Sequence, residues 1–199
     1  MVRRRVDVRR EEILDAAVAE VTRRGFGLTR VGDVAKALGV STALVFYHFD
    51  SKERLLAAAL DHAVGRDLDR LGAAMAQPGT DTERLRRILS LYAPQGAAPG
   101  WTLWVDAWAE ALRNPELRTH CRTLDKRWTD AIAATIASGV ETGAFVCADP
   151  DSAARRITSL MDGLSVQATV HRRLSRTLLK TWTREYAAAQ LAVHPDALR

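Results

Sequence analysis

The chain has 199 residues, of which 47% are hydrophobic and 27% are charged, and its formal net charge is +5. A chain of this size and composition can bury a hydrophobic core in one or two domains. It contains no run of 18 or more apolar residues, and no apolar stretch follows the charged residues at its start. These features exclude a membrane helix and a secretory signal, so we expect a cytoplasmic protein with no membrane partner.

Motifs that would indicate an enzyme or a metal site are missing from the sequence. The two cysteines, Cys121 and Cys147, lie 26 positions apart, which matches no zinc or redox spacing and indicates reduced thiols. HExxH, GxSxG and phosphate-binding loop motifs are absent, and the "GFG" at 25–27 lacks the later glycine of a dinucleotide-binding loop. We therefore expect no catalytic activity, no cofactor and no metal.

Most of the chain has the periodicity of helices. Apolar residues recur near every 3.6 positions, Ala, Leu and Arg are abundant, and strand-like alternation is rare. Glycine and proline clusters mark the breaks between helices. The sequence thus predicts an all-α protein with about nine helices, at residues 7–24, 29–38, 41–47, 51–75, 81–92, 100–112, 115–142, 150–173 and 175–192.

The first ten residues carry five arginines and one aspartate. Such a basic arm ahead of the first helix is suited to a polyanion, and nucleic acid is a better partner than a membrane because the arm has no apolar face. A merely solvated tail is the alternative. If the arm binds DNA, Arg4 and Arg5 would reach a neighbouring minor groove or phosphate strand.

Residues 29–49 have the pattern of two helices joined by a tight turn. Thr29 is suited to cap the first helix, Gly39 to end it with a positive φ, and Ser41 to cap the second. Ala35 is small, as a close helix crossing requires, and Val45 can fix the crossing angle. This is a helix-turn-helix, in which the second helix enters the major groove of DNA.

The stretch "LTRVGDVAKALGVSTALVFYHFDSKERLL" (28–56) resembles the DNA-binding domain of TetR-family transcriptional regulators. The segments "WTLWVDAWAEALRNPELR" and "ADPDSAARRITSLMDGLSVQ" look like the ligand-binding half of the betaine-regulator type within that family. The resemblance implies a DNA-binding head at 1–50 and a ligand-binding and dimerisation body at 51–199. It also implies a homodimeric repressor that a small-molecule inducer releases from a near-palindromic operator.

One residue departs from the family pattern. Phe46 stands where the family usually has a tyrosine whose hydroxyl binds a DNA phosphate, so phosphate anchoring would depend on Tyr47, His48 and Lys52. Phe49 is expected in the core, and a buried aromatic cluster in a domain that binds no DNA is the alternative. The expected DNA-binding residues are Arg4, Arg5, Thr29, Arg30, Ser41, Thr42, Ala43, Leu44, Phe46, Tyr47, His48 and Lys52.

A tryptophan stripe begins the larger half. Trp101, Trp104 and Trp108 recur at helical spacing, which is typical either of a core or subunit contact or of a pocket wall for an apolar ligand. The resemblance favours a pocket, because the body of these regulators holds the inducer. The expected ligand-binding residues are Trp101, Trp104, Trp108, Tyr92, His62, Met75, Cys121 and Met161.

The last two helices carry apolar stripes that suit a four-helix bundle between two chains, although a core within one chain would produce the same stripes. The expected dimer residues are Ile157, Leu160, Met161, Leu164, Ala168, Leu178, Trp182 and Ala189. Two other functions stay open from the sequence. A helical small-molecule enzyme or carrier would need acid or base groups in its pocket, and an architectural DNA protein would have no pocket.

Overall fold

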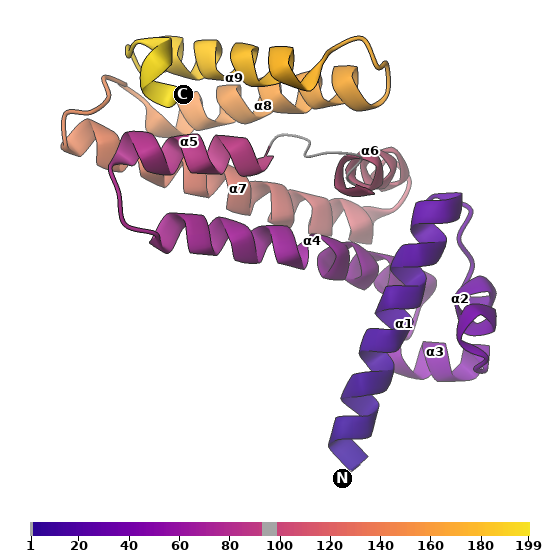
Figure 1. The fold of residues 1–199 in the computed structure, drawn as a ribbon. Coiled ribbons are helices and arrows are strands. Elements are labelled where there is room, and N and C mark those ends of the chain that lie inside the picture. Colours follow the sequence, from indigo (N-terminus) through magenta and orange to yellow (C-terminus); the bar gives the residue numbers. More distant parts are fainter. Residues whose placement is uncertain (1, 93–98) are drawn as a thin grey trace. The chain divides into compact units, whose positions relative to one another are not determined.

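The computed structural model describes residues 2–92 and 99–199, and every regular element in that part of the chain is helical (Figure 1). This confirms the all-α class. Most helices begin or end within two residues of the expected positions. They are α1 (Val2–Arg24), α2 (Val31–Leu38), α3 (Thr42–Phe49), α4 (Lys52–Ala76), α5 (Asp81–Tyr92), α6 (Pro99–Ala111), α7 (Pro115–Glu141), α8 (Pro150–Thr169), α9 (Arg176–Gln190) and the 3-10 helix η1 (Pro195–Leu198).

Two boundaries correct the expectations. The basic arm is not a separate extended segment, because α1 starts at Val2 and no glycine or proline interrupts it before Arg24. The side chains of Arg4 and Arg5 lie outside the described residues. At the other end, α8 stops at Thr169 rather than near residue 173, and Arg172 in the following loop has a φ of 51°, which helical backbone does not allow.

The chain packs as two compact units. The first comprises Met1–Arg66 and Thr102–Leu124, and the second comprises Asp67–Trp101 and Asp125–Arg199. The helices α4, α6 and α7 each run through both ranges. These units describe packing, and the functional division at residue 50 stays a prediction.

In the first unit, α1, α2 and α3 pack around one apolar cluster that also takes in the start of α4. Each of these helices places apolar side chains in the cluster. Burying a residue such as Val or Leu contributes roughly 1.5–3 kcal/mol to the stability of the fold. The cluster therefore fixes the short helices α2 and α3 against α1. Its buried members are Ile13, Leu14, Ala17, Val31, Val34, Ala35, Val45, Phe49, Leu55 and Ala59.

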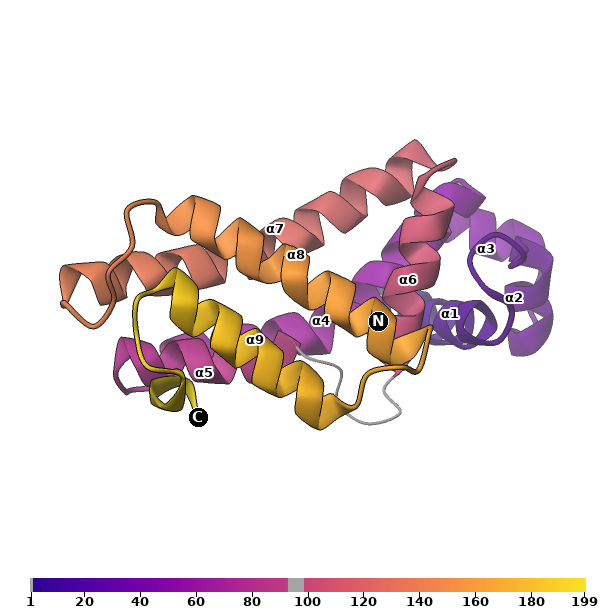
Figure 2. The same cartoon turned by 90° about the horizontal axis from the view of Figure 1, so that it is seen from above.

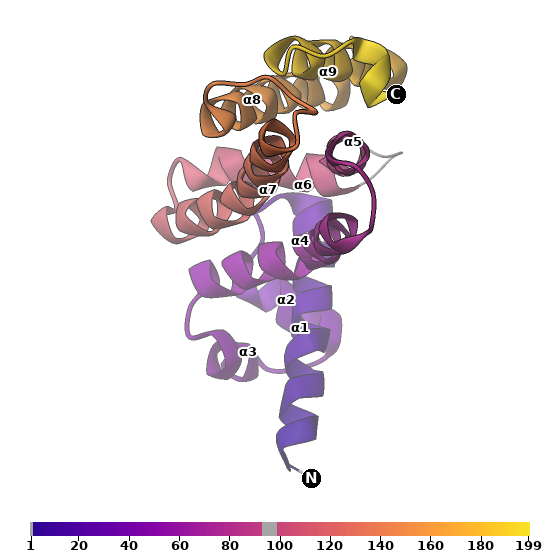
Figure 3. The ribbon, with the colours of Figure 1, turned by 90° about the vertical axis from the view of Figure 1, so that its left-hand side faces the viewer.

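In the second unit, α8 and α9 lie side by side (Figures 2 and 3). The Ser175 hydroxyl caps α9 by accepting from the backbone N–H of Leu178, and η1 then packs against α9 and α5. Ile157 and Met161 of α8 are fully buried, as is Ala187 of α9. These buried residues of α8 and α9 therefore form a core within one chain.

A close approach near the end of α7 requires a glycine. A Cβ built on Gly139 would lie 2.1 Å from Cδ2 of the Phe145 ring, and Phe145 is buried. Because real Cβ atoms do not come so near a ring carbon, the ring packs here only against a bare backbone. The backbone N–H of Phe145 also donates to the carbonyl of Gly139 at 2.9 Å, which holds the ring in place.

We predict that Gly139→Ala lowers the free energy of unfolding by about 1–3 kcal/mol, because the new methyl group overpacks the Phe145 ring. Gly72→Ala is the matched control: this α4 glycine has nothing within 4 Å of a built Cβ, and alanine should add up to about 1 kcal/mol there. Urea unfolding of both variants measures the difference. Equal effects of the two substitutions would contradict the prediction.

Candidate functional site

The helix-turn-helix has the predicted turn. Gly39 ends α2 with a φ of 65°, and the backbone N–H of Val40 donates to the carbonyl of Ala35 at 3.0 Å. The Ser41 hydroxyl then caps α3 by accepting from the backbone N–H of Leu44 at 3.2 Å. Open space surrounds Gly39, so its left-handed backbone is the reason for glycine here. The turn sets where α3 begins.

Of the four rings at the end of α3, Phe49 alone is buried, as expected for a core residue. The Arg10 guanidinium lies over the Phe49 ring at 5.0 Å. Tyr47 is 76% exposed, Phe46 is also exposed, and the half-buried His48 ring meets Tyr47 edge to face at 5.4 Å. Phe46 is therefore a surface residue and not part of the core.

The amino-terminal end of α3 is open to solvent. Ser41, Thr42 and Ala43 are exposed and Leu44 is half-buried, while Val45 is buried in the apolar cluster. The exposed side chains offer hydroxyl and methyl groups, which can contact base edges and thymine methyls in a major groove.

Lys52 stands at the first turn of α4 and is already partly engaged. Its ammonium donates to the carbonyl of Gly27 at 3.3 Å. An ammonium has three donors, so two stay available for a phosphate. Asp50, with a φ of 60°, makes the preceding turn, and Arg54 pairs with its carboxylate at 2.5 Å.

The structure corrects both roles that were expected for Thr29, as a helix cap and as a DNA contact. It is 1% exposed and its hydroxyl donates to the carbonyl of Gly25 at 2.7 Å, so it can neither contact DNA nor cap α2. Arg30, which is exposed, occupies the capping position instead, and its backbone N–H donates to the Asp33 carboxylate at 3.1 Å. Threonine is a common cap, but here the chain turns one residue later.

Helix α6 holds the turn between α1 and α2 within the first unit. The backbone N–H of Phe26, whose side chain is fully buried, donates to the Asp106 carboxylate at 2.6 Å. A Cβ built on Gly25 would lie 3.2 Å from that carboxylate, and one on Gly27 would lie 3.0 Å from Glu110. The sequence reasoning missed Asp106 and Glu110, because no local pattern links α6 to a turn 80 residues earlier.

Three buried aromatic side chains meet in the second unit. The Tyr92 ring packs edge to face against Trp101, with centroids 5.8 Å apart, and against Trp128, with centroids 5.3 Å apart. The Trp101 indole N–H donates to the carbonyl of Tyr92 at 3.1 Å. These three residues, from α5, α6 and α7, are called the aromatic cluster below.

Two carboxyl groups accompany the aromatic cluster. The Tyr92 hydroxyl donates to the Asp162 carboxylate of α8. The pKa of Asp162 is raised to about 6, mainly because burial disfavours the charged form. The hydrogen bond from Tyr92 lowers this pKa, and the nearby Asp125 carboxylate raises it further. Burial also raises the pKa of Asp125. The pKa of the Tyr92 hydroxyl is raised first by burial and then by the neighbouring Asp162 carboxylate. Electron-rich ring faces beside carboxylates favour a cation with an apolar surface.

Of the eight expected ligand-binding residues, the structure brings Tyr92 and Trp101 together. In the first unit, the rings of Trp104 and Trp108 contact each other at a tilt of 45°, with centroids 5.8 Å apart, and Cys121 is buried. The other three have different partners or surroundings. His62 contacts Asp15 at 2.7 Å, Met75 accepts from the Thr135 hydroxyl at 3.7 Å, and Met161 is buried in the α8 core.

Trp128, Asp125 and Asp162 were missed by the sequence reasoning. Trp128 and Asp125 are three positions apart on α7 and so share one face, which is a weak signal in a helix of 27 residues. Asp162 lies between apolar neighbours of α8, and an isolated acid on an apolar stripe would have been the clue.

The expected dimer residues differ in how far they are buried within the chain. Ile157, Met161 and Leu164 are buried in their own chain, so they are corrected to core residues. Leu160 and Ala168 are half-buried and Ala189 is exposed. Leu178 and Trp182 of α9 are 39% and 45% exposed, and they stay candidates for a contact with a second chain.

Within the described residues, no helix is both long and apolar enough to cross a membrane. The same part of the chain holds no group of three or more His, Cys, Asp or Glu residues that could bind a metal ion. Cys121 is buried and Cys147 is half-buried, and no disulfide joins them.

Two family models match the chain. Residues 13–59 match the bacterial regulatory proteins of the tetR family, and residues 81–192 match the C-terminal half of BetI-type transcriptional repressors. An HTH-type transcriptional regulator BetI of Paraburkholderia phymatum is 30% identical over 169 residues, which cover 79% of this chain and 80% of the relative. Another of that name, from Rhizobium meliloti, is 34% identical over 56% of each chain.

Solved structures agree with these matches. A transcriptional regulator from Saccharomonospora viridis in complex with choline is 31% identical, with a TM-score of 0.81 over 93% of this chain and 98% of the other. A TetR transcription regulator from Haloarcula marismortui is 25% identical, with a TM-score of 0.82 over 93% and 99%.

Asp162→Asn should stabilise the ligand-free protein in a pH-dependent way. Because the folded-state pKa of Asp162 is raised to about 6 from 3.8, ionising this carboxyl group costs stability that grows as the pH rises from 3.8 to about 6 and stays constant above it. Urea unfolding should give the variant and the wild type similar stability near pH 4, and the variant an advantage of about 2 kcal/mol at pH 8. An advantage that does not change with pH would contradict the assignment.

Proposed function

We propose that this chain, which belongs to the TetR family of bacterial transcriptional regulators and has a BetI-type C-terminal half, is a homodimeric repressor that a quaternary ammonium compound releases from its operator. The observation that carries the proposal is the aromatic cluster of Tyr92, Trp101 and Trp128 with the half-buried Asp162 beside it.

The chemistry of the cluster supports a ligand of this class. A quaternary ammonium ion carries a positive charge under a shell of methyl groups and donates no hydrogen bond, so aromatic faces suit it better than polar groups do. A cation beside Asp162 would also favour the ionised carboxylate, which burial alone disfavours. The similar regulator from Saccharomonospora viridis was solved with choline, a ligand of this class.

The surface of α3 supports operator binding. Base contacts would come from Ser41, Thr42, Ala43 and Leu44, which are accessible at the start of the helix. Phosphate contacts would come from the exposed Tyr47, together with His48 and Lys52. Phe46 is exposed but has no hydroxyl, so it would pack against sugars or bases and leave the phosphates to its neighbours.

A homodimer would supply a second copy of α3 for the other half of a near-palindromic site. The exposed Leu178 and Trp182 of α9 are large apolar side chains that a partner chain would cover. The exposed Ala189 on the same helix would allow a close approach of the two chains.

Helix α6 offers a path from ligand to DNA. It carries Trp101 of the aromatic cluster, and five residues later it carries Asp106, which holds the backbone of Phe26 between α1 and α2. A ligand that changes the position of Trp101 would thus act on a helix that also supports the DNA-binding head. A coupling free energy of about 1–3 kcal/mol, or roughly 5- to 150-fold in affinity, is typical of such regulation.

We expect Lys52→Ala and Thr42→Ala to weaken DNA binding in different ways. Loss of the Lys52 phosphate contact should weaken binding to all sequences and reduce the slope of log K against log salt by about one unit. Loss of the Thr42 hydroxyl should relax sequence preference and leave the salt slope unchanged. Mobility-shift titrations with the DNA flanking the chain's own gene measure both effects.

Lys126→Ala is the control for net charge, because this exposed α7 lysine belongs to the second unit and pairs there with Asp130. The DNA-binding assignment fails if Lys126→Ala and Lys52→Ala flatten the salt slope equally, or if the wild type shows no operator preference.

The ligand assignment is tested with choline and its uncharged isostere 3,3-dimethylbutan-1-ol. If the positive charge is recognised, choline should bind at least about tenfold more tightly by calorimetry. Asp162→Asn should weaken choline binding about tenfold at pH 8 and leave the alcohol nearly unaffected, because only choline loses a charge interaction. Equal affinities of the wild type for both molecules would exclude a cation site.

A further inference from the structure

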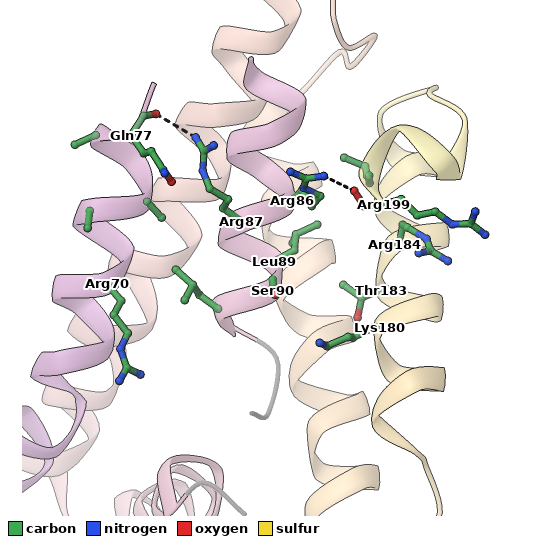
Figure 4. A pocket seen from close by; sticks show the side chains of 15 residues that line it. Arg70, Gln77, Arg86, Arg87, Leu89, Ser90, Lys180, Thr183, Arg184 and Arg199 are labelled. Carbon is green, nitrogen blue, oxygen red and sulfur yellow. Dashed lines mark hydrogen bonds between the residues drawn. The ribbon is translucent and has the colours of Figure 1, made fainter. Parts of the chain in front are cut away.

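A pocket lies within the second unit, and the aromatic cluster does not line it. Its volume is about 1040 Å³, and residues of α4, α5, α9 and η1 line it (Figure 4). None of Tyr92, Trp101, Trp128 and Asp162 is among its lining residues. A space of this size accommodates a small organic molecule.

The lining combines an apolar floor with a basic rim. Alanines of α4 together with Leu89 and Leu198 supply the apolar part. No Asp or Glu belongs to the described lining. Six cationic residues do: Arg70, Arg86, Arg87, Lys180, Arg184 and Arg199.

The charges of this rim are only partly compensated. Arg70 pairs with Asp67 at 3.1 Å and Arg199 pairs with Asp196 at 3.2 Å, both on the surface. Within the described part of the chain, Lys180 and Arg184 make no ion pair.

The Arg86 guanidinium donates to the main-chain oxygen of Arg199 at 2.6 Å, and the Arg87 guanidinium donates to the main-chain oxygen of Gln77 at 3.1 Å (Figure 4). Glu83 lies close to both arginines but outside the lining. Hydrogen bonds from Thr80 are the first cause that lowers the pKa of Glu83, and Arg86 and Arg87 lower it further. The carboxylates of Asp67, Asp196 and Glu83 thus accompany six cationic side chains, and positive side-chain charge stays in excess at the pocket.

Buried polar atoms at the pocket lack partners. Thr183 is 4% exposed, and its hydroxyl has no hydrogen-bond partner among the described residues. The same holds for the Nε atoms of Arg87 and Arg184. Burying such groups without partners costs about 1–3 kcal/mol each, and an oxygen-rich anion could satisfy them.

We propose that this pocket binds an amphipathic anion, a carboxylate or phosphate carried on an aliphatic chain. The head group would lie among Lys180, Arg184 and Thr183, and the chain would lie on the alanines of α4 and Leu89. The ligand has the opposite charge to the one proposed for the aromatic cluster, so the two sites take different molecules. Because the pocket joins α4, α5 and α9, its occupation would tie these helices together.

The test is calorimetric titration of the full chain with decanoate, decyl phosphate and decan-1-ol, all below the concentrations at which they self-associate. We expect one site per chain for at least one of the two anions, and binding of the alcohol at least about tenfold weaker. The preferred anion identifies the head group. An alcohol that binds as tightly as both anions would overturn the proposal.

Variants locate the site. Lys180→Gln and Arg184→Gln should each weaken binding of the anion about five- to tenfold, because each removes one charge contact. Arg127→Gln, an exposed position on α7 outside the lining, is the matched control and should change nothing. Lys180 is exposed, so its replacement should leave folding intact, and urea unfolding checks this.

Asp162→Asn should retain the wild-type affinity for the anion. If Lys180→Gln behaves as Arg127→Gln does, or if Asp162→Asn alters anion binding as strongly as Arg184→Gln, the anion binds elsewhere and the proposal is wrong.

Discussion

The hydrogen bond from the Tyr92 hydroxyl to the half-buried Asp162 carboxylate is the interaction on which the proposed ligand response depends. A partly desolvated acid whose pKa is raised to about 6 is costly to keep ionised, and a neighbouring cation would offset that cost. The same tyrosine orders both tryptophans, since its ring packs on each and its carbonyl accepts from Trp101. Tyr92 thus contacts both the Asp162 carboxylate and the two tryptophan rings of the proposed cation site.

The DNA-binding half depends on a second constraint, which is the position of the turns around α2 and α3. Gly39 sets the start of α3, and Val45 seats it in the apolar cluster, so that the recognition side chains face outward. Asp106 then fixes the turn between α1 and α2 through a single charged hydrogen bond to Phe26. The family relationship and these contacts support the same account, in which α6 connects ligand binding to the head.

The helices, the Gly39 turn and the Ser41 cap could be predicted from the sequence, because helix propensity and capping depend on residues that are close together in the chain. Tertiary partners were not predictable in this way. Thr29 looked like a cap but is buried against Gly25, and the α8 stripe looked like a dimer face but packs within its own chain. Trp101 and Tyr92, two of the expected ligand-binding residues, do lie together, whereas Trp128 and Asp162 join them only through the packing of α7 and α8. The basic pocket gave no sequence signal, because its cations come from three separate helices and from Arg199, which follows η1.

Thermodynamic linkage tests the central claim most directly. If choline and operator DNA bind to opposed states of one protein, saturating operator must weaken choline binding by the same factor by which saturating choline weakens operator binding. We expect a common factor between about 5 and 150 when both affinities are measured by calorimetry in one buffer. A choline affinity that is unchanged by saturating operator would contradict the account.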